Sequence, residues 1–246
     1  MKLALVGYGR MGKLLDQLAP EFGFEVALRL DIDNNLEGAG ITAAAFRPID
    51  VAVEFSMPSV AVDNIERMAA LGVRMVAGTT GWFDHLPRVR AAVERGSAGL
   101  VYSPNFSIGV NVFSRLAETA AHLFDAHPDY DAWAYEIHHK MKKDAPSGTL
   151  LQLVGAMQRS GYSRPIDVSS NRAGAIPGTH IIGFDAEADT ITLTHTARSR
   201  LGFARGALRA AQWIAGRTGV HEFADVLFGS AETRRVLAEP RPSGSG

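Results

Sequence analysis

Residues 2–18 read KLALVGYGRMGKLLDQL and contain the strongest structural signal in the chain. Lys2–Val6 is a short, mostly apolar run of the kind that forms a buried strand. Gly7, Gly9 and Gly12 follow at once with the spacing G-x-G-x-x-G, and leucines at helical spacing fill Lys13–Leu18. A strand that passes through a glycine turn into a helix indicates the first βα unit of a parallel sheet.

The same glycine spacing is typical of a loop that binds the pyrophosphate of a dinucleotide cofactor. The helix start offers free N–H groups and a partial positive charge to the phosphates. About 20 residues on, Asp31 ends the next strand, where an acid can accept hydrogen bonds from a ribose. A simple βα turn without a ligand shares the glycine pattern, so the spacing alone leaves that alternative open. The predicted cofactor-binding residues of this region are Gly7, Tyr8, Gly9, Arg10, Met11, Gly12 and Asp31.

Strands and helices alternate up to about residue 106, which predicts a parallel sheet with helices on both faces. The predicted strands after the first are Val26–Leu30, Val51–Phe55, Arg74–Ala77 and Gly99–Tyr102. The helices between the later strands are predicted at Val60–Leu71 and Leu86–Arg95. Ligands of such sheets sit beyond the carboxyl ends of the strands. We therefore expect a dinucleotide-binding domain over residues 1–106.

A different pattern follows and predicts a smaller α+β domain over residues 107–203. Its expected helices are Val110–Phe124 and Ser147–Met157, and its expected strands are Asp131–His139, Ile166–Ser170, His180–Phe184 and Thr190–Thr196. Several strands in succession favour a mostly antiparallel or mixed sheet. The last segment, residues 204–246, opens with a predicted helix at Ala204–Ala215, and its polar end Pro240–Gly246 is expected to be disordered.

Composition excludes several classes of function. The chain has 246 residues and no cysteine, which rules out disulfides, Cys-ligated zinc, iron–sulfur clusters and thiol catalysis. Lys and Arg number 25 against 26 Asp and Glu, so no general field attracts nucleic acid or anionic lipid. Because no apolar run approaches the ~20 residues of a membrane span, we expect a soluble, cytoplasmic protein with no nucleic-acid or membrane partner.

The segment Glu136–Thr149, EIHHKMKKDAPSGT, has the highest density of reactive side chains. Histidine titrates near neutral pH, so His138 or His139 can act as a general acid beside the lysines that follow. The lysines can hold a carboxylate or polarise an imine, and the helix start near Gly148 can bind a second anion. A solvated lysine face and a plain helix cap are the alternatives. Zinc is not favoured, because there is no cysteine and no H-x-x-x-H spacing, and we predict no metal.

These residues carry a family resemblance that extends over nearly the whole chain. The chain resembles the dihydrodipicolinate reductase family, also called 4-hydroxy-tetrahydrodipicolinate reductase, of bacterial lysine and diaminopimelate biosynthesis. The string His-His-x-x-Lys-x-Asp-Ala-Pro-Ser-Gly-Thr is the most specific marker. The others are Val6–Gly12, Gly78–Thr80, Ser103–Val112, Thr194-His195 through Ser199-Arg200, Phe203-Ala204 and Gly206-Ala207.

The resemblance implies an NAD(P)H-dependent oxidoreductase that reduces 4-hydroxy-tetrahydrodipicolinate, a small cyclic dicarboxylate, to tetrahydrodipicolinate. It implies that His138 is the catalytic proton donor or acceptor and that Lys142 donates a proton beside the substrate. It implies substrate contacts by His139, Gly148 and Thr149. It further implies contacts to the nicotinamide half of the cofactor by Gly78, Thr79, Thr80, Ser103, Pro104, Asn105 and Phe106.

The implied architecture is a Rossmann domain plus an α+β domain that assembles a homotetramer, with the C-terminal helix returning to the Rossmann domain. The threonines at 190, 192, 194 and 196 share one strand face, so we expect the second-domain sheets to pair between subunits. The alternatives from the residues alone are another two-domain NAD(P)-dependent dehydrogenase and an NAD(P)-sensing regulator without catalysis.

One departure from the family concerns the cofactor. The family often has an arginine after the acid that ends the second strand, whereas Ile32 follows Asp31 here. A carboxylate at this place repels a 2′-phosphate, and Asp33, a second candidate for the ribose contact, adds to the repulsion. The nearest cation is Arg29, which shares a strand face with Asp31. We therefore expect NADH to be preferred over NADPH.

Overall fold

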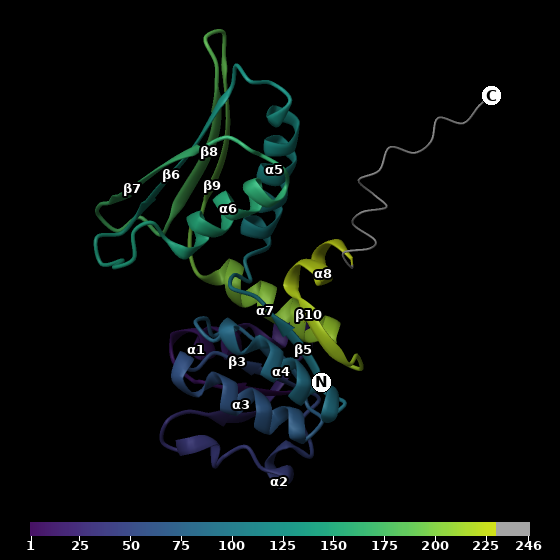
Figure 1. The fold of residues 1–246 in the computed structure, drawn as a ribbon. Helices are drawn as coiled ribbons and strands as arrows, with labels where there is room; N and C mark the ends of the chain where they lie inside the picture. Colours follow the sequence, from purple (N-terminus) through teal and green to yellow (C-terminus); the bar gives the residue numbers. More distant parts are fainter. Residues whose placement is uncertain (230–246) are drawn as a thin grey trace, which may run out of the picture. The chain divides into compact units, whose positions relative to one another are not determined.

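The computed structural model describes residues 1–229 and consists of two compact units. Within the described chain, one contains Met1–Phe106 and residues 203–229, and the other contains Ser107–Gly202. The polar tail Pro240–Gly246 lies outside the described residues. Each unit has its own sheet (Figure 1).

The first unit is a six-stranded, all-parallel sheet with the strand order β10-β5-β4-β3-β1-β2. Its strands are β1 (Lys2–Val6), β2 (Glu25–Leu30), β3 (Val51–Glu54), β4 (Arg74–Ala77), β5 (Gly99–Tyr102) and β10 (Gly219–Glu222). Its helices are α1 (Arg10–Leu18), α2 (Ala43–Phe46), α3 (Pro58–Ala70), α4 (Leu86–Arg95), α7 (Leu201–Ile214), which begins at the unit boundary, and α8 (Phe223–Phe228). Short 3₁₀ turns lie at Ala19–Phe22, Leu36–Gly38 and Phe83–His85.

The burial of each strand agrees with its position in the sheet. The central strands β1, β3, β4 and β5 are almost wholly buried, as expected for strands covered on both faces, whereas the edge strand β2 alternates. The predicted parallel α/β fold is thus confirmed. Strand β10 was not predicted from the sequence, because four residues with a single aliphatic side chain give no strand signal. It lies at the edge of the sheet, where it pairs with β5.

The second unit has a four-stranded mixed sheet with the order β7-β6-β8-β9. Its strands are β6 (Asp131–His138), β7 (Ile166–Arg172), β8 (Thr179–Asp185) and β9 (Thr190–Thr196), and its helices are α5 (Ile108–Asp125) and α6 (Gly148–Arg159). Only the β6–β7 pair is parallel. Both helices lie on the same face of the sheet (Figure 1), and each begins at a serine whose hydroxyl caps the first turn.

The two faces of this sheet differ in character. The face under α5 and α6 is a small apolar core that includes Ala132, Ala134, Ile182 and Phe184. Alternate residues of β6, such as Trp133 with its ring over Gly183, point to the opposite face. In the described part of this unit, no helix covers that face (Figure 1). The alternation also places polar residues on the inner face of the sheet, at the carboxyl end of β6.

Candidate functional site

The glycine loop at the carboxyl end of β1 packs closely against neighbouring backbone at two of its three glycines. Gly7 has φ +94°, and a Cβ there would collide with the carbonyl of Phe55. A Cβ at Gly12 would collide with the carbonyl of Gly7. At Gly9, in contrast, a Cβ would meet no atom within 4 Å. The fold itself therefore does not require a glycine at position 9, and the open space beside it fits the approach of a pyrophosphate.

A cleft of about 440 Å³ opens beside this loop, at the carboxyl ends of β1, β2 and β3. The exposed side chains of Ile32, Leu36 and Met57 form part of its lining, together with the carboxylates of Asp31 and Glu37. Apolar walls with an acid at one edge fit the adenine and ribose of a dinucleotide. The complete lining is Gly7, Gly9, Leu30, Asp31, Ile32, Asn35, Leu36, Glu37, Phe55, Ser56, Met57, Val60 and Asn64.

Arg29 does not line this cleft, although the sequence makes it the nearest cation to Asp31. Its guanidinium binds Asp16 of α1 through two hydrogen bonds of 2.7 and 2.8 Å and lies 6.0 Å from the ring centre of Tyr8. The Tyr8 hydroxyl also donates to Asp16. The Arg29 bonds hold the pKa of the Asp16 carboxyl below its usual range. Arg29 is therefore committed to an ion pair outside the cleft.

The strand-end loops of β3 and β4 meet at a buried acid, Glu54. Its Oε1 accepts hydrogen bonds from the Ser56 amide and hydroxyl and, at 3.0 Å, from the Thr79 hydroxyl. Its Oε2 is buried and has no hydrogen-bond partner in the described part of the chain, and burial raises the pKa of this carboxyl despite the bonds to Oε1. The Thr79 hydroxyl thus points into the protein, which leaves its backbone and the exposed Thr80 for contact with a cofactor. Glu54 was not identified from the sequence.

The loop after β5 is also held from within. The Ser103 hydroxyl donates to the Asn105 carbonyl and accepts from the Asn105 amide, at 2.8 and 3.1 Å. Phe106 is buried, and its ring centre lies 4.9 Å from that of Phe223 in α8. Pro104 is exposed. The four predicted residues of this loop therefore form a rigid turn at the carboxyl edge of the sheet.

In the second unit, Glu136 is the centre of a polar cluster on the inner face of the sheet. Its side chain is fully buried. Oε1 accepts from the Ser147 amide at 2.8 Å, the Arg172 guanidinium at 2.8 Å and the Ser170 hydroxyl at 3.2 Å, and Oε2 accepts from the Ser147 hydroxyl. Burial raises the pKa of Glu136, but the bonds from Ser147 and Arg172 outweigh it, so the pKa lies below its usual value.

Two buried histidines flank this carboxylate. Nδ1 of His138 lies 3.5 Å from Glu136 Oε2, and Nε2 of His180 lies 3.4 Å from the same oxygen. The two rings meet edge to face at 5.0 Å between centres. Burial lowers the pKa of His138, although Glu136 opposes the shift. Burial, with a contribution from His138, lowers the pKa of His180 to about 4.

The loop from β6 to α6 carries the remaining predicted residues of this unit. The Lys142 ammonium binds Asp144 at 2.9 Å and lowers the pKa of that carboxyl. Lys142 also acts electrostatically on His138, so the two predicted catalytic residues lie in the same region. Gly148 is exposed with open space around it and begins α6, and Thr149 and His139 are half-buried.

The sequence analysis missed Glu136, Arg172 and His180 as members of this site. Glu136 precedes His138 by two positions in a strand, so the two share a face, and that signal was available. Arg172 and His180 are opposite His138 and Glu136 only through the β6–β7 and β6–β8 registers. Those registers cannot be read from the sequence.

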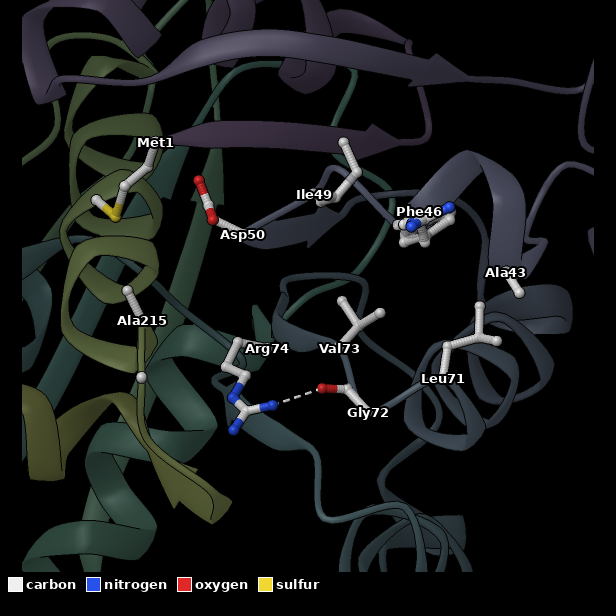
Figure 2. A pocket seen from close by; sticks show the side chains of 12 residues that line it. Met1, Ala43, Phe46, Ile49, Asp50, Leu71, Gly72, Val73, Arg74 and Ala215 are labelled. Carbon is white, nitrogen blue, oxygen red and sulfur yellow. Dashed lines mark hydrogen bonds between the residues drawn. The ribbon is translucent and has the colours of Figure 1, made fainter.

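A second cavity, of about 750 Å³, lies at the amino ends of the parallel strands, at the opposite end from the glycine loop (Figure 2). It is formed where the strands begin, near Met1, Asp50 and Arg74. Asp50 accepts from the Lys2 amide, and the Arg74 guanidinium donates to the Gly72 carbonyl. These charged groups fix loops of the fold itself, and ligands of parallel α/β sheets bind at the other edge.

The parallel sheet, the glycine loop and the cleft beside it define a nicotinamide-dependent dehydrogenase with a second, α+β unit. The family model described as "Dihydrodipicolinate reductase, N-terminus" matches residues 1–106, and the one described as "Dihydrodipicolinate reductase, C-terminus" matches residues 109–227. The chain belongs to the dihydrodipicolinate reductase family. Family membership confirms the resemblance seen in the sequence and decides against a regulator without catalysis.

Individual relatives agree with this assignment. The chain is 34% identical over 238 residues to the 4-hydroxy-tetrahydrodipicolinate reductase of Christiangramia forsetii, covering 92% of this chain and 98% of the relative. It is 36% identical over 265 residues to the enzyme of the same name from Thiobacillus denitrificans, with the same coverages. A dipicolinate-bound dihydrodipicolinate reductase from Paenisporosarcina shares the fold, with a TM-score of 0.75 at 21% identity over 90% of this chain and 97% of that one. Among the described helices, none is long and apolar enough to cross a membrane.

The state of Glu54 predicts a pH-dependent stability. Its pKa is raised in the folded protein, so its stabilising effect is complete below the unfolded value of about 4.3 and declines as pH rises toward the folded value. Replacing Glu54 by Gln removes the buried charge and keeps an acceptor oxygen. We expect the Glu54→Gln variant to gain thermal stability over the native chain between about pH 5 and pH 8, and to lose this advantage near pH 4.

Thermal unfolding measured across that pH range tests this expectation. The matched control is Glu25→Gln, because Glu25 is exposed on β2 and its substitution should leave the pH profile unchanged. A stability difference between Glu54→Gln and the native chain that is constant with pH would show that the pKa of Glu54 is not raised by folding.

Proposed function

We propose that this chain reduces 4-hydroxy-tetrahydrodipicolinate to tetrahydrodipicolinate in lysine and diaminopimelate biosynthesis. The observation that carries the proposal is the cluster at the carboxyl end of β6, where His138, Lys142 and the start of α6 lie in one loop region. The relatives that cover this chain almost completely carry the corresponding enzyme name. The dipicolinate bound to the Paenisporosarcina enzyme is a planar dicarboxylate of the same class.

The reaction adds a hydride and a proton to the substrate and releases water, and a bound NADH or NADPH supplies the hydride. The residues proposed to hold this cofactor are the glycine loop Gly7–Gly12, Asp31, and the strand-end loops Gly78–Thr80 and Ser103–Phe106. The open space at Gly9 and the apolar cleft beside Asp31 support this assignment. The proton and the binding of two carboxylates are left to the second unit.

Two anionic groups need two cationic or N–H-rich sites. The start of α6 provides one, through the amides of Gly148 and Thr149 and the Thr149 hydroxyl. Lys142 and His139 provide the other. Lys142 is paired with Asp144, so the substrate carboxylate takes the place of Asp144 on the ammonium when it binds. That exchange keeps the lysine charge satisfied in both states.

His138 is proposed to transfer the proton, with Lys142 as the second donor. Burial lowers the pKa of His138 in the free protein. A dianionic substrate beside the ring favours the imidazolium and raises this pKa. Substrate binding is therefore coupled to proton uptake at His138, which prepares the general acid only when a substrate is present.

The acidic adenosine end of the cleft supports NADH as the preferred cofactor. Asp31 and Glu37 line the cleft, no Lys or Arg occurs among its lining residues in the described chain, and Arg29 is bound to Asp16. A 2′-phosphate would meet negative charge without a cation to balance it.

The uncovered face of the second sheet supports a homotetramer. Trp133, Tyr135 and Ile137 lie on this face with the threonines of β9, and the face is only partly shielded within the chain. Apolar and β-branched residues on an open sheet face are typical of a surface that pairs with another subunit.

The catalytic assignment predicts distinct kinetic effects for two groups of residues. His138→Ala or Lys142→Ala should lower kcat by roughly 10²–10⁴-fold, the usual contribution of a positioned proton donor. Thr149→Ala should raise KM, because a hydrogen bond to a charged group contributes about 1.5–3 kcal/mol. The measurement is the loss of nicotinamide absorbance with substrate generated in situ, with cofactor binding followed separately by fluorescence titration.

Lys143→Ala is the matched control, because Lys143 is an exposed neighbour of Lys142 and its loss should change neither constant. Full activity of His138→Ala and Lys142→Ala would contradict the assignment of these two residues as proton donors. Loss of cofactor binding together with activity would make the two residues structural.

The cofactor assignment predicts a kcat/KM for NADH about ten-fold above that for NADPH, a difference of about 1.4 kcal/mol. Asp31→Asn should improve the use of NADPH relative to NADH, because it removes a charge that repels the 2′-phosphate. Asp63→Asn serves as the control, since Asp63 is an exposed acid of α3 that lies near Arg88 and does not line the cleft. A native enzyme that is faster with NADPH would contradict the assignment.

The assembly predicts a particle of four times the chain mass of 26.4 kDa by light scattering at micromolar concentration. Thr192→Arg places a charge in the middle of the open face of β9 and should dissociate the particle, because a buried unpaired charge destabilises an interface. A native monomer would reject the tetramer.

A further inference from the structure

The proposed chemistry does not use Glu136, yet its carboxylate accepts four hydrogen bonds inside the second unit. It is a fully buried carboxylate with donors from β7 and from the start of α6. An ionised group is costly to bury unless it is paired and hydrogen-bonded. A charge kept in this position, two residues before the proposed proton donor, calls for a functional explanation.

We propose that Glu136 is a positioning residue that holds His138 as the Nδ1–H tautomer, so that Nε2 is the atom that transfers the proton, and that the same carboxylate fixes the start of α6 through Ser147. The inference rests on the proposed role of His138. It adds to that role the reactive nitrogen and the group that selects it.

The surroundings of the ring favour this tautomer. Nδ1 of His138 is buried, lies 3.5 Å from Glu136 Oε2 and has no hydrogen-bond partner among residues 1–229. A lone pair on Nδ1 would face a carboxylate oxygen, whereas an N–H there is attracted to it. The contact shortens to a charge-assisted hydrogen bond when the ring is protonated. After Nε2 gives up its proton, the neutral ring retains its hydrogen at Nδ1.

The opposite edge of the ring is kept clear by a glycine. Gly178 has φ +146°, and a Cβ at this position would lie 2.9 Å from Nε2 and 3.0 Å from Cδ2 of His138. A side chain here would therefore press on the nitrogen that we assign to proton transfer. Glycine leaves Nε2 unobstructed.

The carboxylate also connects the proton donor to the anion site. Glu136 accepts from both the amide and the hydroxyl of Ser147, and the Ser147 hydroxyl in turn accepts from the Leu150 amide as the cap of α6. One buried group thus orients the imidazole on β6 and the helix start that is proposed to bind a carboxylate. We expect this shared contact to fix the imidazole and the helix start relative to each other.

A metal site is the competing explanation for this cluster. Ligand atoms of Glu136, His138 and His180 all lie within 4.8 Å of one another, as a two-histidine, one-carboxylate site requires. Arg172, however, donates to Glu136 Oε1 at 2.8 Å, so a cation already balances the carboxylate. The hydroxyls of Ser147 and Ser170 also donate hydrogen bonds to the Glu136 carboxylate. The cluster is therefore completed by the protein's own groups.

The charged groups that face His138 determine in which direction each substitution should shift its pKa. Glu136 and Asp144 raise the pKa of His138, and Lys142 and Arg172 lower it, while the buried His180 packs against its ring. Turnover that needs a protonated His138 falls as pH rises through its pKa. Glu136→Gln should therefore move this falling limb of the kcat profile to lower pH, and Arg172→Gln should move it to higher pH.

We expect Glu136→Gln also to lower kcat by roughly 10–100-fold, the usual effect of removing the partner that orients a functional imidazole. Glu118→Gln is the control, because Glu118 pairs with Arg115 on the surface of α5 and should leave the profile unchanged. The double variant Glu136→Gln/Arg172→Gln leaves no unpaired buried charge, which keeps the test available if a single variant does not fold. Limbs that stay in place, or that move in the same direction in both single variants, would overturn the proposal.

A second measurement uses the native chain and needs no turnover. Nitrogen NMR of ¹⁵N-histidine-labelled protein, with His138→Gln to assign the signal, reports which ring nitrogen carries the proton above the pKa. The expected result is Nδ1–H, and Nε2–H would overturn the inference. If His138→Gln keeps full activity while the native ring is Nδ1–H, the catalytic role of His138 fails and the tautomer assignment stands. A stoichiometric metal in the purified protein would overturn the positioning role.

Discussion

The second unit depends on the ion pair between Glu136 and Arg172, which lies on the inner face of its sheet beside a small apolar core. Residues 132, 134, 182 and 184 make that face an ordinary small core, and the polar cluster begins at the next inward position of β6. A carboxylate there is tolerated because Arg172, Ser147 and Ser170 supply its hydrogen bonds. Removal of Arg172 would leave the fully buried Glu136 carboxylate without its cation, whereas removal of Glu136 would leave a half-buried guanidinium without its ion pair.

In the first unit, the glycine loop and the buried acid Glu54 determine the structure at the carboxyl ends of the strands. The collisions that a Cβ would make at Gly7 and Gly12 show that two of the loop glycines serve the fold, while the third faces open space and is free to serve a ligand. The strand ends beside the loop are held by Glu54, whose bonds to Ser56 and Thr79 join β3 to β4. Glu54 thus holds Ser56, which lines the cleft, and Thr79 in fixed positions. Such buried hydrogen bonds preorganise a site.

The sequence predicted the parts of the molecule that depend on local pattern, and missed those that depend on register. The parallel sheet follows from such a pattern and is confirmed by the structure. The glycine loop and the segment Glu136–Thr149 are local markers of the family resemblance, which the family models confirm, while the roles of their residues stay predictions. Arg29 forms an ion pair with Asp16 of the neighbouring helix α1. Arg172 and His180 contact Glu136 from the two strands that pair with β6. The alternation in β6 was visible, but not that its alanines face inward and its aromatic residues outward. Such choices are made by tertiary packing.

We propose that the start of α6 and Lys142 together form a dicarboxylate site beside His138. The decisive test is a crystal structure of the chain with NADH and pyridine-2,6-dicarboxylate. We expect one carboxylate on the amides of Gly148 and Thr149, and the other on a Lys142 ammonium that has left Asp144. A ligand bound elsewhere, for example in the cavity near Asp50 and Arg74 (Figure 2), with Lys142 still on Asp144, would contradict it.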